Sequence, residues 1–251
     1  MCSRKSADPP PAVRAGPTAG ARDETVRPVI YAADVLLLAF DTATPATTAA
    51  VHDGRRVLAE TVTVDARRHG ELLMPSIISV LGQAGAARHD VTAVVVGTGP
   101  GPYTGLRVGL VTARVLGAAL GVPAYGVCTL DAIARAAVTA AAGREFLVAT
   151  DARRKEVYWA RYSAAGRRIL GPEVGRPAGL DPAAPAAGEG PRLYPESFGD
   201  PIGPRYPAAS MLADLAAERL AAGAVLPPAE PLYLRRPDAR VPGPPKRVSP
   251  A

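Results

Sequence analysis

The stretch GTGPGPYTGLRVGLVTARVLGAALG, residues 97–121, constrains the fold more than any other part of the chain. It opens on a loop rich in glycine and proline and continues as an apolar helix. Small residues recur every four positions along it: Gly105, Gly109, Ala113, Gly117 and Gly121. Glycine inside a helix costs about 1 kcal/mol relative to alanine, so interior glycines need a compensating contact. The stretch therefore predicts a tight turn into a helix whose small-residue side lies close to another backbone.

The same helix is apolar on a second side. Three valines share that side: Val108, Val111 and Val115. Arg107 and Arg114 form a narrow strip between the two sides. Since a helix that is apolar on two sides is covered twice, we expect one cover to be its own sheet. The other is a neighbouring helix, either the predicted helix at residues 69–85 or a helix of a partner protein.

The glycine-proline loop has some features of a phosphate site. A helix that starts after such a loop offers free backbone N–H groups. The spacing, however, is neither that of a P-loop nor GxGxxG, and Pro100 and Pro102 each lack an N–H donor. Two interpretations stay open. One is a rigid turn, and the other is a weak phosphate or nucleotide site, which the following residues would form: Asp41, Gly99, Gly101 and Thr104.

A strand that ends in aspartate and leads into a hairpin occurs twice. The first copy runs from Asp41 to Gly54, and the second runs from Asp151 to Gly166. With the helices and strands that alternate between the copies, this predicts an α/β fold with a duplicated lobe. In two-lobed ATPases of the actin and sugar-kinase type such carboxylates face a nucleotide cleft. Neither turn here contains the glycine that close approach of phosphate favours, so polar strand ends that cap a turn are the alternative.

The chain divides by composition into four parts. Residues 1–34 have no apolar period and are predicted to be a disordered extension. Residues 35–142 and 143–234 are predicted to be the two lobes, and 235–251 a basic, disordered tail. The tail holds five basic residues against one acidic residue, so much of the net charge of +6 lies outside the lobes. The charge balance therefore does not mark the lobes as a nucleic-acid binder.

Several classes of site are not predicted. Cys2 and Cys128 give no disulfide framework, which favours a reducing cytoplasm. The three histidines, at 52, 69 and 89, do not pair at a metal-ligand spacing. We therefore predict no metal, no cofactor and no catalytic residue. No segment has the length and apolar character of a membrane span.

Five segments together carry a family resemblance: LLAFDTATPATTAAV, RHGELLMPSI, VVVGTGPGPYTGLRVGLVTARVLGAALGVPAYGVCTLDAIA, TDARRKEVYWARY and EPLYLR. They resemble the TsaB family, bacterial accessory proteins of tRNA threonylcarbamoyladenosine biosynthesis. The resemblance covers about residues 35–236, and only loosely residues 171–207. It implies an actin-like (ribonuclease-H-like) duplicated fold of two lobes.

The resemblance also implies a function. A chain of this family is a non-catalytic partner of the TsaD-type transferase, which modifies the adenosine beside the anticodon in tRNAs that read ANN codons. A TsaE-type ATPase joins through the complex, tRNA is engaged indirectly, and the isolated chain can form a homodimer. The implied partner interface lies on the two helices at 69–85 and 104–120, with these contact residues: Leu73, Ile77, Arg107, Val111 and Arg114. Two alternatives stay open, an actin-like kinase or ATPase and a glycoprotease-like metallopeptidase.

Overall fold

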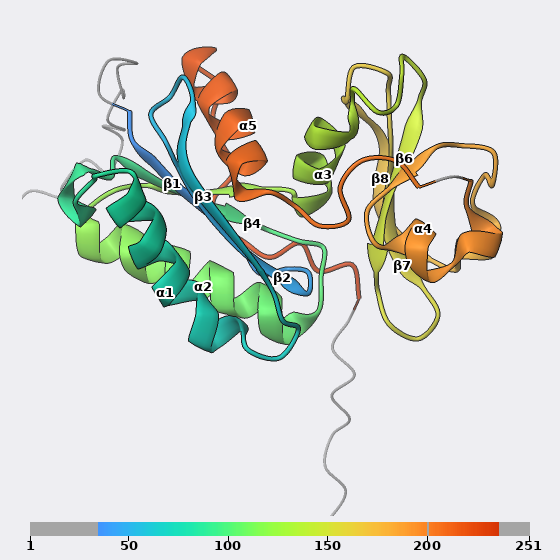
Figure 1. Cartoon of the computed structure of the whole chain (residues 1–251), viewed down its shortest axis with the longest axis horizontal. Helices are drawn as coiled ribbons and strands as arrows, with labels where there is room; N and C mark the ends of the chain where they lie inside the picture. Colours follow the sequence, from blue (N-terminus) through green and yellow to red (C-terminus); the bar gives the residue numbers. More distant parts are fainter. Residues whose placement is uncertain (1–34, 200, 236–251) are drawn as a thin grey trace, which may run out of the picture.

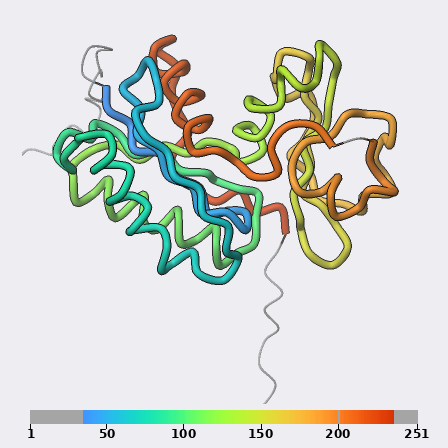
Figure 2. The backbone as a smooth tube through the Cα atoms, in the orientation of Figure 1, coloured from blue at the N-terminus to red at the C-terminus, as the bar shows by residue number. Residues whose placement is uncertain are grey.

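Two lobes lie side by side in a computed structural model that describes residues 35–199 and 201–235 (Figures 1 and 2). The predicted extension at 1–34 lies outside the described residues, as does the predicted tail apart from residue 235. Each lobe is built on one mixed sheet. The expected α/β class is therefore confirmed.

The first lobe has a five-stranded sheet in the order β3-β2-β1-β4-β5. Its strands are β1 (Leu37–Asp41), β2 (Ala46–His52), β3 (Val57–Val64), β4 (Ala93–Gly97) and β5 (Ala124–Val127). The first three form an antiparallel meander, and β4 and β5 continue the sheet parallel to β1. Every residue of β1 and β4 is buried, because helices cover both faces of this sheet.

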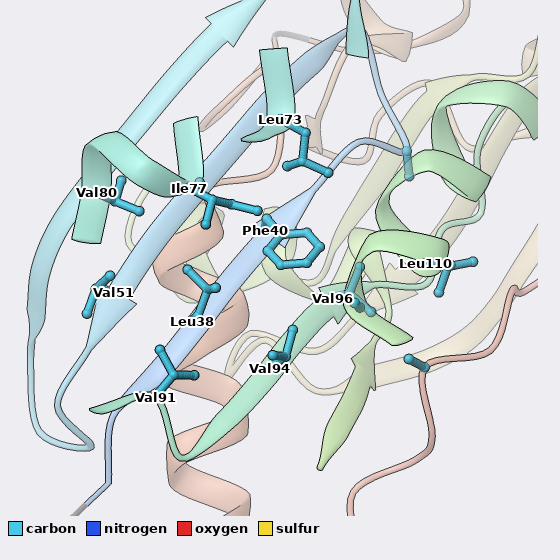
Figure 3. Packing of buried hydrophobic residues seen from close by; sticks show 14 of the residues in the cluster. Leu38, Phe40, Val51, Leu73, Ile77, Val80, Val91, Val94, Val96 and Leu110 are labelled. Carbon is cyan, nitrogen blue, oxygen red and sulfur yellow. The ribbon is translucent and has the colours of Figure 1, made fainter. Parts of the chain in front are cut away.

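One face of this sheet carries α1 (His69–Gln83) and α2 (Tyr103–Leu120), and the opposite face carries α5 (Ala209–Ala221) (Figure 1). Figure 3 shows the first of these cores, where side chains of α1 and α2 pack on β1 and β4. Its labelled members include Leu38, Phe40, Leu73, Ile77, Val96 and Leu110. Burial of this continuous apolar layer is the main stabilisation of the lobe.

The second lobe repeats the start of the first on a smaller scale. Its sheet has the order β8-β7-β6-β9, with β6 (Phe146–Asp151), β7 (Val157–Tyr162), β8 (Arg168–Gly175) and β9 (Ala186–Ala187). The meander of β6, β7 and β8 is antiparallel, and β9 is parallel to β6, as β4 is to β1. The helix α3 (Thr129–Ala137) packs against this sheet and also contacts α5, and the short α4 (Gly190–Leu193) packs on β6. The predicted duplication is thus present in the strand topology.

The predicted boundary between the lobes needs one correction. The helix α5 falls in the range assigned to the second lobe, but it packs on β1 and β2 of the first. Polar contacts of two α5 residues, Ser210 and Asp214, hold it there. His52 Nε2 donates to Asp214 Oδ1 at 2.9 Å, and the backbone N–H of Ser210 donates to Glu60 Oε1 at 2.9 Å. Because the partners are more than 140 residues apart in the chain, the range of a lobe cannot be taken from sequence order alone.

Candidate functional site: the interlobe turns and the outer helical face

Asp41, at the end of β1, lies inside a closed hydrogen-bond network. Its side chain is fully buried, and its Oδ1 accepts from the Ala43 backbone N–H at 2.7 Å. Its Oδ2 accepts from the Thr129 hydroxyl at 2.6 Å, and that hydroxyl accepts from the Gly99 N–H at 3.0 Å. Burial raises the pKa of Asp41 to about 6, although these hydrogen bonds oppose the rise. Both oxygens are thus directed at the protein, and Asp41 joins β1, the glycine-proline loop and α3.

The glycine-proline loop presses against the turn that follows β1. A Cβ atom at Gly101 would lie 2.1 Å from the Ala43 carbonyl oxygen, and one at Gly105 would lie 2.5 Å from the Thr42 carbonyl oxygen. Thr42 also bonds α2 directly, since its hydroxyl donates to the Gly105 carbonyl at 2.7 Å. The close backbone approach predicted for the small-residue side is therefore to this lobe's own β1–β2 turn.

The space between the lobes at this point is small. It is lined by the β1–β2 turn, Pro102, Glu189 and the end of β6, and its volume is about 10 Å³, which is room for roughly one water molecule. The residues of the phosphate hypothesis occupy different settings. Asp41, Gly99 and Gly101 lie close together, but they contact the β1–β2 turn, the glycine-proline loop and Thr129 of the protein itself. Thr104 is exposed in the first turn of α2. This geometry favours the rigid turn over the phosphate site.

The second repeated aspartate also serves a turn. Asp151 Oδ1 accepts from the Arg153 backbone N–H at 2.8 Å, and its Oδ2 lies 3.2 Å from the Arg153 guanidinium. The backbone then passes through three successive left-handed residues, Arg153, Arg154 and Lys155, with φ of 61°, 57° and 59°. Each left-handed non-glycine residue costs about 1–2 kcal/mol, so the surrounding contacts must hold this turn in place.

A segment that follows α5, residues 226–235, helps to hold this turn in place, and we term it the strap. In the first lobe the Leu232 N–H donates to the Thr98 carbonyl at 2.9 Å. At the second lobe Arg235 donates to the Ala152 carbonyl at 2.8 Å and pairs with Glu156. The strap therefore connects the loop before α2 with the turn after β6. Sequence analysis identified its segment EPLYLR only as part of a family resemblance.

The outer sides of α1 and α2 carry exposed apolar side chains. Met74 and Ile78 on α1 are 42% and 66% exposed, and Val111 and Val115 on α2 are each 59% exposed. The two helices contact each other on the same face of the sheet. We term these four side chains the outer face.

The expected contact residues on these helices divide into three groups. Leu73 and Ile77 are only 1% and 2% exposed, since they belong to the core of the first lobe (Figure 3), so their expected place at an interface is corrected. Val111 lies on the outer face. Arg107 and Arg114 are exposed but also bond the strap: Arg107 Nε donates to the Tyr233 hydroxyl at 2.9 Å, and Arg114 Nε donates to the Ala229 carbonyl at 3.0 Å.

Within 35–199 and 201–235, no three His, Cys, Asp or Glu side chains gather in a way that could hold a metal ion. Among the same residues, no helix combines the length and the apolar character that crossing a bilayer requires.

Comparison with known proteins places the chain in a family. The family model "TsaD: tRNA N6-adenosine threonylcarbamoyltransferase" matches residues 56–196, more than half of the chain. An uncharacterized protein of Mycobacterium tuberculosis is 47% identical over 208 residues, which cover 81% of this chain and 93% of that protein.

Two further relatives carry names. The Escherichia coli "tRNA threonylcarbamoyladenosine biosynthesis protein TsaB" is 36% identical over 126 residues, which cover 50% of this chain and 54% of that protein. The solved structure of YeaZ from Pseudomonas aeruginosa aligns with a TM-score of 0.69 and 31% identity, covering 80% of this chain and all of that one. With the repeated strand topology of the two lobes, these matches show that the chain belongs to the TsaB family.

Proposed function

We propose that this chain is the non-catalytic partner subunit in the threonylcarbamoyl modification of the adenosine beside the anticodon, in tRNAs that read ANN codons. It acts by forming a heterodimer with a TsaD-type transferase, in the cytoplasm. The relative from Escherichia coli, whose name refers to tRNA threonylcarbamoyladenosine biosynthesis, supports this assignment. A TsaE-type ATPase and tRNA join the same complex.

The observation that carries the proposal is the outer face. Its four side chains, Met74, Ile78, Val111 and Val115, lie on neighbouring helices and are each more than two-fifths exposed. Clusters of exposed apolar side chains rimmed by polar residues are typical of protein–protein interfaces. Arg107 and Arg114 supply such a rim on α2, and arginine is enriched at interfaces.

A non-catalytic role is supported by the interlobe turns. In an actin-like enzyme the carboxylates at the ends of the first strands need access to a ligand. Here both oxygens of Asp41 are bound by protein groups, and the space between the β1–β2 turn and the end of β6 has a volume of about 10 Å³. Asp151 uses its carboxylate to hold the Arg153 turn.

The experiment combines co-purification with nucleoside analysis. The chain and the TsaD-type subunit of the same organism are co-expressed, and a strain depleted of the chain is analysed for the modified nucleoside. We expect a stable heterodimer and loss of the modification on depletion. Absence of both results, or turnover of ATP or a peptide by the purified chain, would favour the kinase or metallopeptidase alternative.

A further inference from the structure

Two adjoining hollows lie beside α3, α5 and the strap. The first, of about 530 Å³, lies between α3, α5 and the turn that joins β7 to β8. The second, of about 490 Å³, continues along the strap and the start of β8. Both are lined by Asp131, Arg168 and Arg219, so they form one elongated depression. We term it the arginine groove.

Four arginines line the first hollow: Arg135, Arg167, Arg168 and Arg219. Only two carboxylates, those of Asp131 and Glu218, lie there with them, which leaves an excess of two positive charges. Glu230 lines the second hollow, but its carboxylate lies 4.0 Å from the Arg114 guanidinium. Over both hollows four arginines face three carboxylates, so the groove is cationic, most strongly in the first hollow.

Arg135 lies 3.3 Å from the Glu218 carboxylate, whereas the other three arginines keep donors available for a ligand. Asp131 Oδ1 accepts from the Tyr162 hydroxyl at 2.9 Å, whereas Arg168 and Arg219 lie 3.6 Å and 3.8 Å from its oxygens. These two distances exceed the usual range of an N–H···O hydrogen bond, and each guanidinium carries five N–H groups. Among the described residues, the guanidinium of Arg167 has no hydrogen-bond or ion-pair partner.

We propose that the arginine groove binds the phosphodiester backbone of tRNA. Guanidinium groups match phosphate oxygens in geometry as well as charge. An open groove formed by two hollows suits successive phosphates of a strand better than a single small anion. The first hollow lies beside α3 and α5, and α5 covers the face of the five-stranded sheet opposite α1 and α2 (Figure 1), so a protein on the outer face leaves this hollow accessible. The inference deepens the proposed function, on which its choice of tRNA rests.

The test measures tRNA binding by the full chain, alone and with the transferase subunit, as a function of salt concentration. The variant Arg167→Ala/Arg219→Ala removes two groove charges. The control Arg55→Ala/Arg88→Ala removes the same charge from exposed sites in the β2–β3 turn and after α1. We expect the groove variant to bind on the order of tenfold more weakly at low salt, and its slope of log affinity against log salt to shrink by about two. The control should keep the wild-type slope.

Three further measurements make the result decisive. The single variant Arg167→Ala, whose side chain bonds nothing in the fold, should lower the slope by about one if the double variant fails to fold. Equal tRNA binding by folded groove and control variants would overturn the inference, even where the heterodimer assembles normally. Calorimetry with ATP or inorganic phosphate tests for a small-anion site. If the groove variant loses affinity for either of these anions but binds tRNA as the wild type does, the groove is a small-anion site and the inference is wrong. Loss of heterodimer formation alone would instead count against the proposed function.

Discussion

At the scale of single residues, Asp41 links the acid–base behaviour of the chain to its stability. Burial raises its pKa from 3.8 to about 6 in the folded protein. The folded state therefore holds this proton to a higher pH than the unfolded state does. By linkage, the contribution of Asp41 to the free energy of unfolding falls as the pH rises from about 4 to about 6, by roughly 3 kcal/mol.

The substitution Asp41→Asn removes this titration while keeping the size of the side chain. We expect the variant to gain stability relative to the wild type, by roughly 3 kcal/mol, between pH 4 and pH 7. A constant offset is also expected, because an amide group has a single oxygen and cannot accept from both the Ala43 N–H and the Thr129 hydroxyl as the carboxylate does. Urea denaturation at several pH values measures the difference. Asp181→Asn, at an exposed position, is the control, and a stability difference for Asp41→Asn that does not change with pH would refute the assignment.

The role of Asp41 could be only partly predicted from the sequence. Its place at a strand end allows either a ligand contact or a cap for the turn. The partner that decides between these readings, Thr129, lies 88 residues further along the chain. Nothing in the local pattern around Asp41 indicates that contact. The same holds for Arg167 and Arg219, which only the packing of α5 beside the second lobe brings together.

At the scale of elements, α2 is the part that sequence reasoning described best. The spacing of its small residues predicts a close backbone approach, and Gly105 and Gly109 meet Thr42 of the β1–β2 turn. The partner of that side was not predictable, since the hydrogen bond between Thr42 and Gly105 spans 63 residues. On α1, apolar residues occupy core and outer-face positions alike, so the sequence does not separate the buried Leu73 and Ile77 from the exposed Met74 and Ile78.

Two glycine substitutions separate the steric requirement from helix propensity. Gly105→Ala places a methyl group 2.5 Å from the Thr42 carbonyl oxygen, so we expect the free energy of unfolding to fall by about 1–3 kcal/mol. Gly82→Ala, in α1, has open space around its Cβ and should raise it by about 0.5–1 kcal/mol. Chemical denaturation of both variants measures the contrast. If both substitutions stabilise the chain, the packing of α2 on the β1–β2 turn is looser than described.

At the scale of the whole molecule, the two lobes are joined by α3, α5 and the strap. The alternation of elements and the repeated aspartates predict two related lobes. The segment at 171–207 could not be placed, because β9 has two residues and α4 has four, too few for a readable period. The position of the strap could not be predicted from its own residues either, because its hydrogen bonds are made to distant loops of both lobes.

The substitution Arg235→Ala tests whether the strap holds the turn of the second lobe. Arg235 donates to the Ala152 carbonyl and pairs with Glu156, and hydrogen bonds of a charged group contribute about 1.5–3 kcal/mol. We expect amide hydrogen exchange in residues 151–158 to become at least about tenfold faster. Arg176→Ala, an exposed arginine in the same lobe, should leave that exchange unchanged. Unchanged exchange in the Arg235→Ala variant would show that the turn is held by its own contacts.

The heterodimer is the central claim, and its most direct test is the dissociation constant between this chain and a TsaD-type subunit. Val111→Glu places a charge in the outer face, where an interface would bury it without a partner. Val225→Glu, at a valine that is 74% exposed beyond α5, is the matched control. We expect Val111→Glu to weaken binding at least about thirtyfold with an unchanged melting temperature, and Val225→Glu to bind like the wild type. A folded Val111→Glu variant that binds the transferase subunit as tightly as the wild type would contradict the account.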